Sequence, residues 1–134
     1  MNFPRLPRRP RFWFASFLVW IAVLCICSSF SIGGGAPPAV HHLDKIQHFG
    51  YFFGGSGLLT AALFRLKPDQ PAWGKIILTV VILLACVGWL DEWHQTFTPG
   101  RSGNDVYDWL ADVLGALGGA LTFKAVHLRL KWIA

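Results

Sequence analysis

Four long apolar stretches divide the chain, and each is close to the length of a membrane-crossing helix. Residues 12–32 carry no charge over 21 positions. An α-helix rises 1.5 Å per residue, so about 20 residues cross a hydrocarbon core of about 30 Å. Residues 46–64 have strongly polar side chains only at their start, and residues 72–90 have one charge, Lys75, near an end. These three stretches therefore predict transmembrane helices.

The fourth stretch, residues 106–128, is less apolar because it contains Asp108, Asp112 and Lys124. Its centre, residues 113–123, holds only apolar, small or hydroxyl-bearing side chains, so we predict a fourth span. The third helix should continue beyond Leu90 to about residue 97. The pattern thus predicts an all-α integral membrane bundle of four transmembrane helices, at about 12–32, 46–64, 72–97 and 106–128. We expect residues 1–134 to form a single membrane domain.

Composition supports a membrane protein. Hydrophobic residues make up 54% of the 134 residues and charged residues 14%, whereas a soluble domain has about 25% charged residues. This apolar content excludes intrinsic disorder. The three cysteines lie inside apolar stretches and form no CxxC pair, so we expect small buried residues without a redox or metal role.

The basic residues are distributed unevenly between the two predicted sides of the membrane. Two lie on one side, Lys45 and Arg101, and ten lie on the other. Basic residues favour the cytoplasmic side, so we predict a multi-pass cell-membrane protein with both termini cytoplasmic. The net charge of +5 is then explained by the orientation of the protein in the membrane. It gives no reason to expect a nucleic-acid partner. The ten are Arg5, Arg8, Arg9, Arg11, Arg65, Lys67, Lys75, Lys124, Arg129 and Lys131.

The first apolar stretch also has features of a signal peptide, with a basic start and the small residues 33–36 after it. Its apolar part is longer than the 7 to 15 residues usual in such a peptide. We therefore expect this helix to be retained.

Six of the seven acidic residues lie at the predicted outer ends of the helices. Asp44 and His48 are four residues apart, and Asp108 and Asp112 share a helix face with Gly115 and Gly119. Ionisable groups in membrane helices usually face the bundle interior, and glycines allow close helix contact. We therefore predict an extracytoplasmic polar pocket, here called the crown. Its ten residues are Asp44, Lys45, His48, Asp91, Glu92, His94, Gln95, Arg101, Asp108 and Asp112.

Three segments of the crown resemble the motifs of the VanZ-like family. Residues 44–49, DKIQHF, are similar to its DKxxHF motif. Residues 91–101, DEWHQTFTPGR, resemble DExxQxFxPGR, and residues 108–115 resemble DxxxN/DxxG. The resemblance covers a motif core of residues 44–119. Tyr51 stands one position before the usual tyrosine of the family, and the spacing from Arg101 to Asp108 is about one residue longer than in many members.

The resemblance implies a small polytopic protein of the bacterial cell envelope. The founding member of the family is linked to low-level resistance to the glycopeptide teicoplanin. The resemblance therefore implies an effect on glycopeptide susceptibility, with the lipid bilayer and a lipid-linked cell-wall precursor or a glycopeptide as partners. It implies no particular oligomeric state.

The crown residues also suggest acid–base chemistry. An unperturbed histidine titrates near neutrality, so His48 could act as a general base oriented by Asp44, with Glu92 and Asp108 as further catalytic candidates. The alternative to catalysis is a structural Asp–His hydrogen bond. An enzyme of this kind would act on a phosphate- or amide-containing lipid-linked envelope substrate.

The remaining crown residues are candidates for substrate binding. Arg101 could hold a phosphate or carboxylate in a bidentate manner. The alternative is a structural role, in which Arg101 forms an ion network with the acidic residues of the crown. The other candidates for substrate binding are Lys45, Gln95, Asp91 and Asp112.

The acids, together with His48 or His94, could also hold a divalent metal. The chain has no HExxH signature, so the sequence assigns no definite cofactor and leaves the metal unknown. A transporter is disfavoured because the inner halves of the last three helices carry few polar groups. An envelope-binding protein and an enzyme both remain as interpretations.

Overall fold

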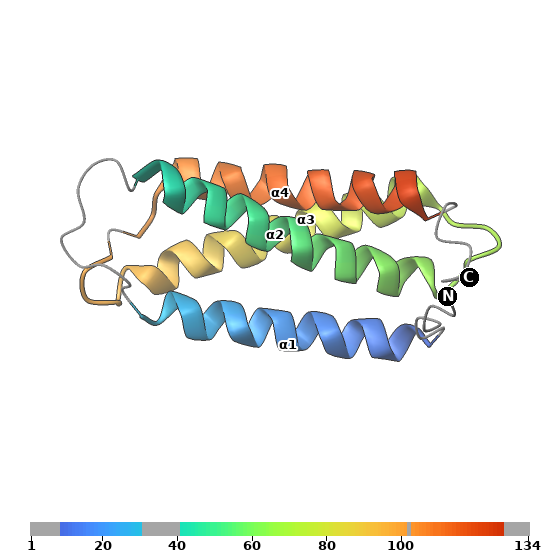
Figure 1. Cartoon of the computed structure of the whole chain (residues 1–134), viewed down its shortest axis with the longest axis horizontal. Helices are drawn as coiled ribbons and strands as arrows, with labels where there is room; N and C mark the ends of the chain where they lie inside the picture. The colour runs from blue at the N-terminus through green and yellow to red at the C-terminus, as the bar shows by residue number, and fades with distance from the viewer. Residues whose placement is uncertain (1–8, 31–40, 102, 128–134) are drawn as a thin grey trace, which may run out of the picture.

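The computed structural model describes residues 9–30, 41–101 and 103–127, and these form four α-helices. They are α1 (Pro10–Ser28), α2 (His41–Phe64), α3 (Trp73–Gln95) and α4 (Val106–Val126). The helices lie alongside one another in an elongated bundle, with the start of α1 and the end of α4 at the same end (Figure 1). The predicted all-α class is confirmed.

Three helices, α1, α3 and α4, are long and apolar enough to cross a membrane. Helix α2 is as long, but its glycines and polar residues lower its hydropathy. It packs against all three other helices. Its less apolar surface is therefore largely turned toward protein.

The observed helices overlap the predicted spans but differ at their ends. Helix α1 ends at Ser28, before the predicted residue 32, and residues 31 and 32 lie outside the described residues. Helix α2 begins at His41 and not near residue 46, so Asp44 and Lys45 belong to its first turns. Helix α3 ends at Gln95 and α4 at Val126, each two residues before its predicted end.

Helices α2 and α4 meet at two glycines of α4, as their spacing predicted. A Cβ atom added at Gly115 would collide with the backbone carbonyl of Phe49, and one added at Gly119 with that of Phe53. The neighbouring Ala116 is fully buried, and its carbonyl accepts a hydrogen bond from the Ser56 hydroxyl. The two backbones can approach this closely only because these positions lack side chains.

Helix α1 is attached to α2 through Trp20. The Trp20 indole Nε1 donates to the carbonyl of Tyr51 at 3.1 Å, and the Tyr51 hydroxyl donates to the carbonyl of Trp20 at 3.0 Å. The indole also lies against Gly54 and Gly55. Tyr51, which departs from the family position, thus holds two helices together.

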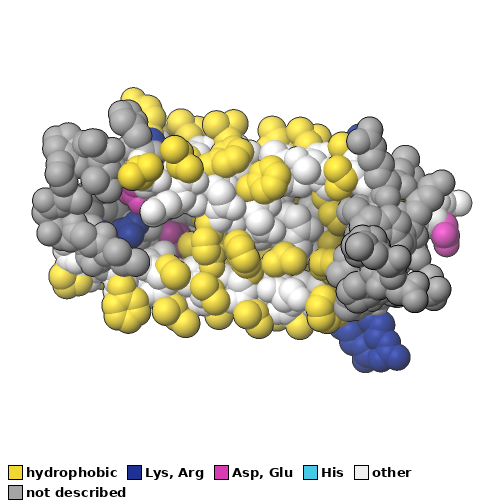
Figure 2. Space-filling view, in the orientation of Figure 1, with side chains coloured by type: hydrophobic (Ala, Val, Ile, Leu, Met, Phe, Trp, Pro, Cys, Tyr) yellow, Lys and Arg dark blue, Asp and Glu magenta, His cyan; other side chains and the backbone are white. Residues whose placement is uncertain are grey.

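The surface is strongly apolar. In Figure 2, hydrophobic side chains extend along the visible face between its two grey ends, and charged side chains appear only near those ends. Cys25, Cys27 and Cys86 are exposed free thiols, so the prediction that they are buried is wrong. They lie on outward helix faces because an apolar segment of a membrane helix can face lipid as well as core.

Candidate functional site

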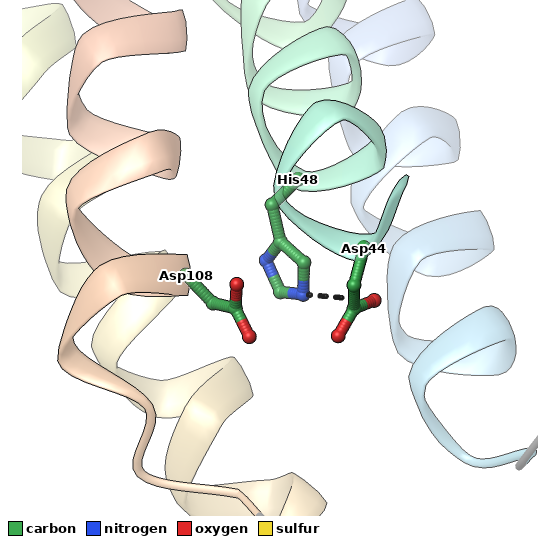
Figure 3. A group of neighbouring side chains, drawn as sticks. All are labelled: Asp44, His48 and Asp108. Atoms are coloured by element: carbon green, nitrogen blue, oxygen red, sulfur yellow. Dashed lines mark ion pairs between the residues drawn. The ribbon is translucent and has the colours of Figure 1, made fainter. Parts of the chain in front are cut away.

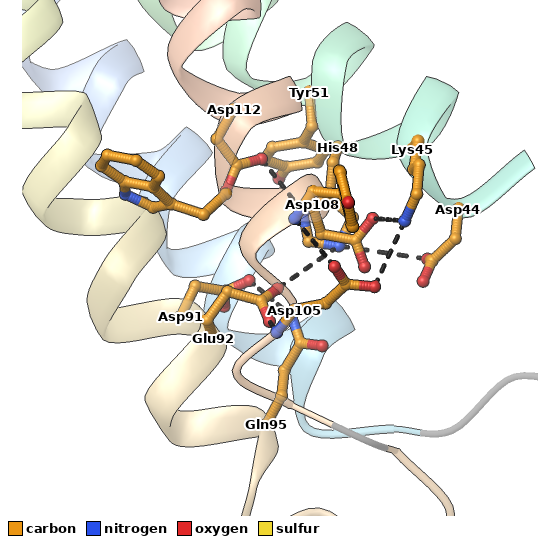
Figure 4. Close-up of polar contacts among 12 residues, drawn as sticks. Asp44, Lys45, His48, Tyr51, Asp91, Glu92, Gln95, Asp105, Asp108 and Asp112 are labelled. Atoms are coloured by element: carbon orange, nitrogen blue, oxygen red, sulfur yellow. Dashed lines mark hydrogen bonds and ion pairs between the residues drawn. The ribbon is translucent and has the colours of Figure 1, made fainter. Parts of the chain in front are cut away.

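The crown lies at the end of the bundle where α1 and α3 end and α2 and α4 begin. The helical repeat of each helix brings its crown residues onto an inward face. The first turns of α2 carry Asp44, Lys45 and His48. The last turns of α3 carry Asp91, Glu92 and Gln95, and the first turns of α4 carry Asp108 and Asp112. The last five are all buried, and Figure 4 shows the side chains converging from the three helices.

His48 lies at the centre of this group. Its Nδ1 atom is 2.9 Å from Oδ1 of Asp112, whose side chain is fully buried. Its Nε2 atom is 3.9 Å from Oε1 of Glu92 and 4.0 Å from Oδ1 of Asp44, and the ring stands between Asp44 and Asp108 in Figure 3. From the sequence we expected Asp44 to orient His48, but the distance between Nε2 and Oδ1 of Asp44 is longer than a hydrogen bond. Asp112 is the carboxylate that fixes the ring.

Lys45 joins the first turns of α2 and α4. Its Nζ atom is 2.8 Å from Oδ1 of Asp108 and 3.2 Å from Oδ2 of Asp105. Asp105 also caps α4 by accepting the backbone N–H of Tyr107 at 2.8 Å. Partial burial favours neutral Asp105, but the Tyr107 N–H and the Lys45 ammonium outweigh it and lower the pKa of Asp105. This carboxylate is therefore a stable anchor for Lys45.

Arg101 is connected to the crown through Gln95. Its Nε donates to Oε1 of Gln95 at 2.9 Å, and Nε2 of Gln95 donates to Oδ2 of Asp91 at 2.7 Å. Its Nη2 atom stays 3.9 Å from Oδ1 of Asp44. The loop after α3 thus folds back over the site.

Glu92 connects the end of α3 to the loop before α4. Its Oε2 accepts the backbone N–H of Asp105 at 2.7 Å, and its own carbonyl accepts that of Asn104 at 3.3 Å. Asn104 has a left-handed backbone, with φ of 53°, a conformation that asparagine tolerates better than most residues. The loop is therefore shaped to contact Glu92.

His94 does not join the other nine residues. It is exposed, whereas Asp91, Glu92 and Gln95 on the same helix are buried. The predicted membership of His94 in the crown is therefore wrong. Its position in the helical repeat places it off the face that these three residues share with Gly88.

Two residues that the sequence analysis missed help to build the site. Asp105 is the second carboxylate partner of Lys45. Gly88 lies beside Asp112, and a Cβ atom there would come within 2.6 Å of Oδ2 of Asp112. Gly88 precedes Asp91 and Glu92 by three and four residues, so its place on their helix face was a usable signal.

The site can hold a proton or a cation in its interior. Among the described residues, Oε1 of Glu92 and Oδ2 of Asp112 are buried without a hydrogen-bond partner. Two overlapping groups of side chains have the geometry of metal ligands, and in each the ligand atoms lie within 4.8 Å of one another. The groups are Asp44, His48 and Asp108, and His48, Asp91 and Glu92.

The family model for VanZ/LLP1 matches residues 5–128. The chain belongs to the VanZ/LLP1 family. The resemblance of the three motifs to this family is thereby confirmed, and the apolar helices agree with a VanZ-like membrane protein. A comparison with curated proteins gave no match, and neither did a comparison with solved structures.

The VanZ-like motifs each supply one helix end to the crown. The first motif brings His48 on α2, the second brings Glu92 on α3 together with the Arg101 loop, and the third brings Asp112 on α4. Motifs far apart in the chain thus form one connected set of polar contacts.

Proposed function

We propose that the chain crosses the cell membrane four times, as one domain over residues 1–134, with α2 as the fourth span. Both termini are cytoplasmic, and the crown opens on the extracytoplasmic side. The ten-to-two distribution of basic residues supports this orientation. The start of α1 and the end of α4 lie at the end of the bundle away from the crown (Figure 1), which agrees with an even number of crossings.

Cysteine labelling in intact cells tests this topology. In a background with Cys25, Cys27 and Cys86 replaced by alanine, Asn104→Cys should react with a membrane-impermeant maleimide from outside. Gln70→Cys should react only after the membrane is permeabilised, because it lies in the loop between α2 and α3. Both positions are exposed, so access to the reagent depends on the side of the membrane. Labelling of Gln70→Cys alone in intact cells would contradict the orientation.

The crown of this envelope protein binds an anionic group of a cell-wall component and so lowers susceptibility to teicoplanin. The observation that carries this proposal is the position of Arg101 at the edge of the crown. Its side chain is 21% exposed and Nη2 is beyond hydrogen-bond length from Asp44. A guanidinium in this position can offer paired N–H donors to a phosphate or carboxylate. Lipid-linked cell-wall precursors and stem peptides carry such groups.

Expression of the chain in a teicoplanin-sensitive Gram-positive host tests this function. The minimal inhibitory concentration of teicoplanin should be several-fold higher for cells that make the wild-type protein than for cells with the empty vector. It should also be several-fold higher than for cells that make the Arg101→Gln variant at equal membrane abundance. An unchanged concentration with wild-type protein present in the membrane would refute the proposal.

The second candidate function is hydrolysis of a lipid-linked envelope substrate, favoured by the contact of His48 with Asp112. With Nδ1 held by Asp112 at 2.9 Å, Nε2 is the ring nitrogen that remains to exchange a proton with a substrate in the region around it. Asp44, Glu92 and Asp108 surround that region as acid–base candidates. Release of phosphate or an amine from a lipid-linked precursor by purified protein would distinguish this function from binding alone.

A further inference from the structure

Glu92 has a carboxylate oxygen that the protein itself does not satisfy. The side chain is only 4% exposed. Oε2 accepts the Asp105 backbone N–H, but Oε1 has no hydrogen-bond partner among the described residues and lies 3.9 Å from Nε2 of His48. A buried acceptor left unpaired costs about 1–3 kcal/mol, and more when it is charged. The position of Oε1 therefore suits a cation or a proton as its partner.

The His48 imidazole is held as a metal-ligating histidine usually is. Such residues donate one ring N–H to a carboxylate or carbonyl, which fixes the tautomer and leaves the other nitrogen for the metal. Here Nδ1 contacts the fully buried Asp112 at 2.9 Å. With the proton on Nδ1, Nε2 keeps its lone pair for a metal, and this atom lies 3.9 Å from Oε1 of Glu92.

The distances suit ligands that share an ion. The ligand atoms of His48, Asp91 and Glu92 lie within 4.8 Å of one another. A separation of 3.9 Å is too long for a hydrogen bond. Two ligands at about 2.1 Å from a tetrahedral ion are about 3.4 Å apart, so a small movement of the side chains would complete the coordination.

The charges of the site favour this group over the group of Asp44, His48 and Asp108. Lys45 already lies 2.8 Å from Asp108, and the guanidinium of Arg101 approaches Asp44. Neither cation of the crown pairs with Asp91, Glu92 or Asp112. A divalent ion between Asp91 and Glu92 would offset that excess of negative charge.

We propose that His48, Asp91 and Glu92 bind one divalent transition-metal ion through Nε2 and two carboxylates, and that Asp112 is a positioning residue for the His48 ring. Imidazole together with carboxylates suits Zn²⁺ or Mn²⁺ better than Mg²⁺ or Ca²⁺. This inference does not depend on the proposed effect on teicoplanin.

Metal binding by the full chain in detergent tests the site. The protein is first stripped of metal with a chelator, then equilibrated with Zn²⁺ or Mn²⁺ alone and desalted. Elemental analysis should then find one retained ion per chain. An excess of Mg²⁺ should not displace this ion. His48→Asn, which keeps a donor near the place of Nδ1 but lacks Nε2, and Glu92→Gln should each bind at least tenfold more weakly. Asp112→Asn should weaken binding by about 10- to 100-fold. Asp69→Asn, an exposed acid outside the crown, is the matched control and should bind normally.

Wild-type protein that retains no more metal than His48→Asn would overturn the proposal and leave the crown as an ion-pair network. Equal affinity of Glu92→Gln and wild type would also overturn it. The helix content of each variant by circular dichroism shows that it is folded, and the wild-type titration decides the question even where a variant does not fold. Because the readout is bound metal, failure here leaves the teicoplanin proposal standing.

Discussion

Replacement of Gly119 with leucine should prevent accumulation of folded protein. A Cβ atom at this position would collide with the Phe53 carbonyl and come within 2.9 Å of the Cβ atom of Ser56. Backbone atoms cannot give way as a flexible side chain can, so α2 and α4 would have to separate. Overpacking costs about 1–3 kcal/mol even where side chains can adjust, and here the crown contacts between the same two helices would be lost as well.

Gly57→Leu is the matched control for this substitution. Gly57 lies on α2, and a Cβ atom there would meet nothing within 4 Å. Leucine also favours a helix over glycine by about 1 kcal/mol, so this variant should fold as well as wild type or better. The measurement is the monodisperse fraction after size-exclusion chromatography in detergent. Equal yields of the two leucine variants would show that the α2–α4 contact is not tight.

Replacement of His48 with leucine should destabilise the bundle by about 1–3 kcal/mol or more, the usual cost of leaving a buried charged acceptor without its hydrogen bond. Asp112 is fully buried and receives a hydrogen bond only at Oδ1, from His48, while Oδ2 has no partner among the described residues. Leucine would leave both oxygens unpaired. His48→Asn should be less destabilised, because its amide can still donate toward Asp112.

Denaturant titration followed by circular dichroism measures this effect. Gln47→Leu is the matched control, since Gln47 precedes His48 on α2 but is exposed. We expect the stability order Gln47→Leu, then His48→Asn, then His48→Leu, with the first equal to wild type. If His48→Leu were as stable as Gln47→Leu, the contact with Asp112 would contribute nothing to folding.

The helices were predictable because the length of an apolar stretch is a local property of the sequence. Their ends were not, because contacts between helices decide them. The start of α2 was placed too late since residues before 46 are polar, yet the ion pairs of Lys45 with Asp105 and Asp108 stabilise that first turn. The exposed cysteines show a similar limit, because an apolar stretch does not indicate which of its faces meets lipid.

The residues of the crown were predictable from spacing and family motifs, but their pairing was not. Helical spacing put Asp44 on the same face as His48, and it could not reveal that Asp112 lies closer. That contact depends on the rotation and closeness of α2 and α4, which the contacts of Gly115 and Gly119 fix. His94 was harder to exclude from sequence, because it follows Asp91 by three residues, and residues at that spacing are neighbours on a helix surface.

The central claim is that the crown has a function beyond holding the helices together. The most direct test is the teicoplanin susceptibility of cells that make Arg101→Gln, His48→Asn or the control Asp69→Asn at equal membrane abundance. We expect the control to protect as wild type does and the two crown variants to lose most of the increase in inhibitory concentration. Full protection by both crown variants at normal abundance would contradict the claim and leave the crown with a structural role only.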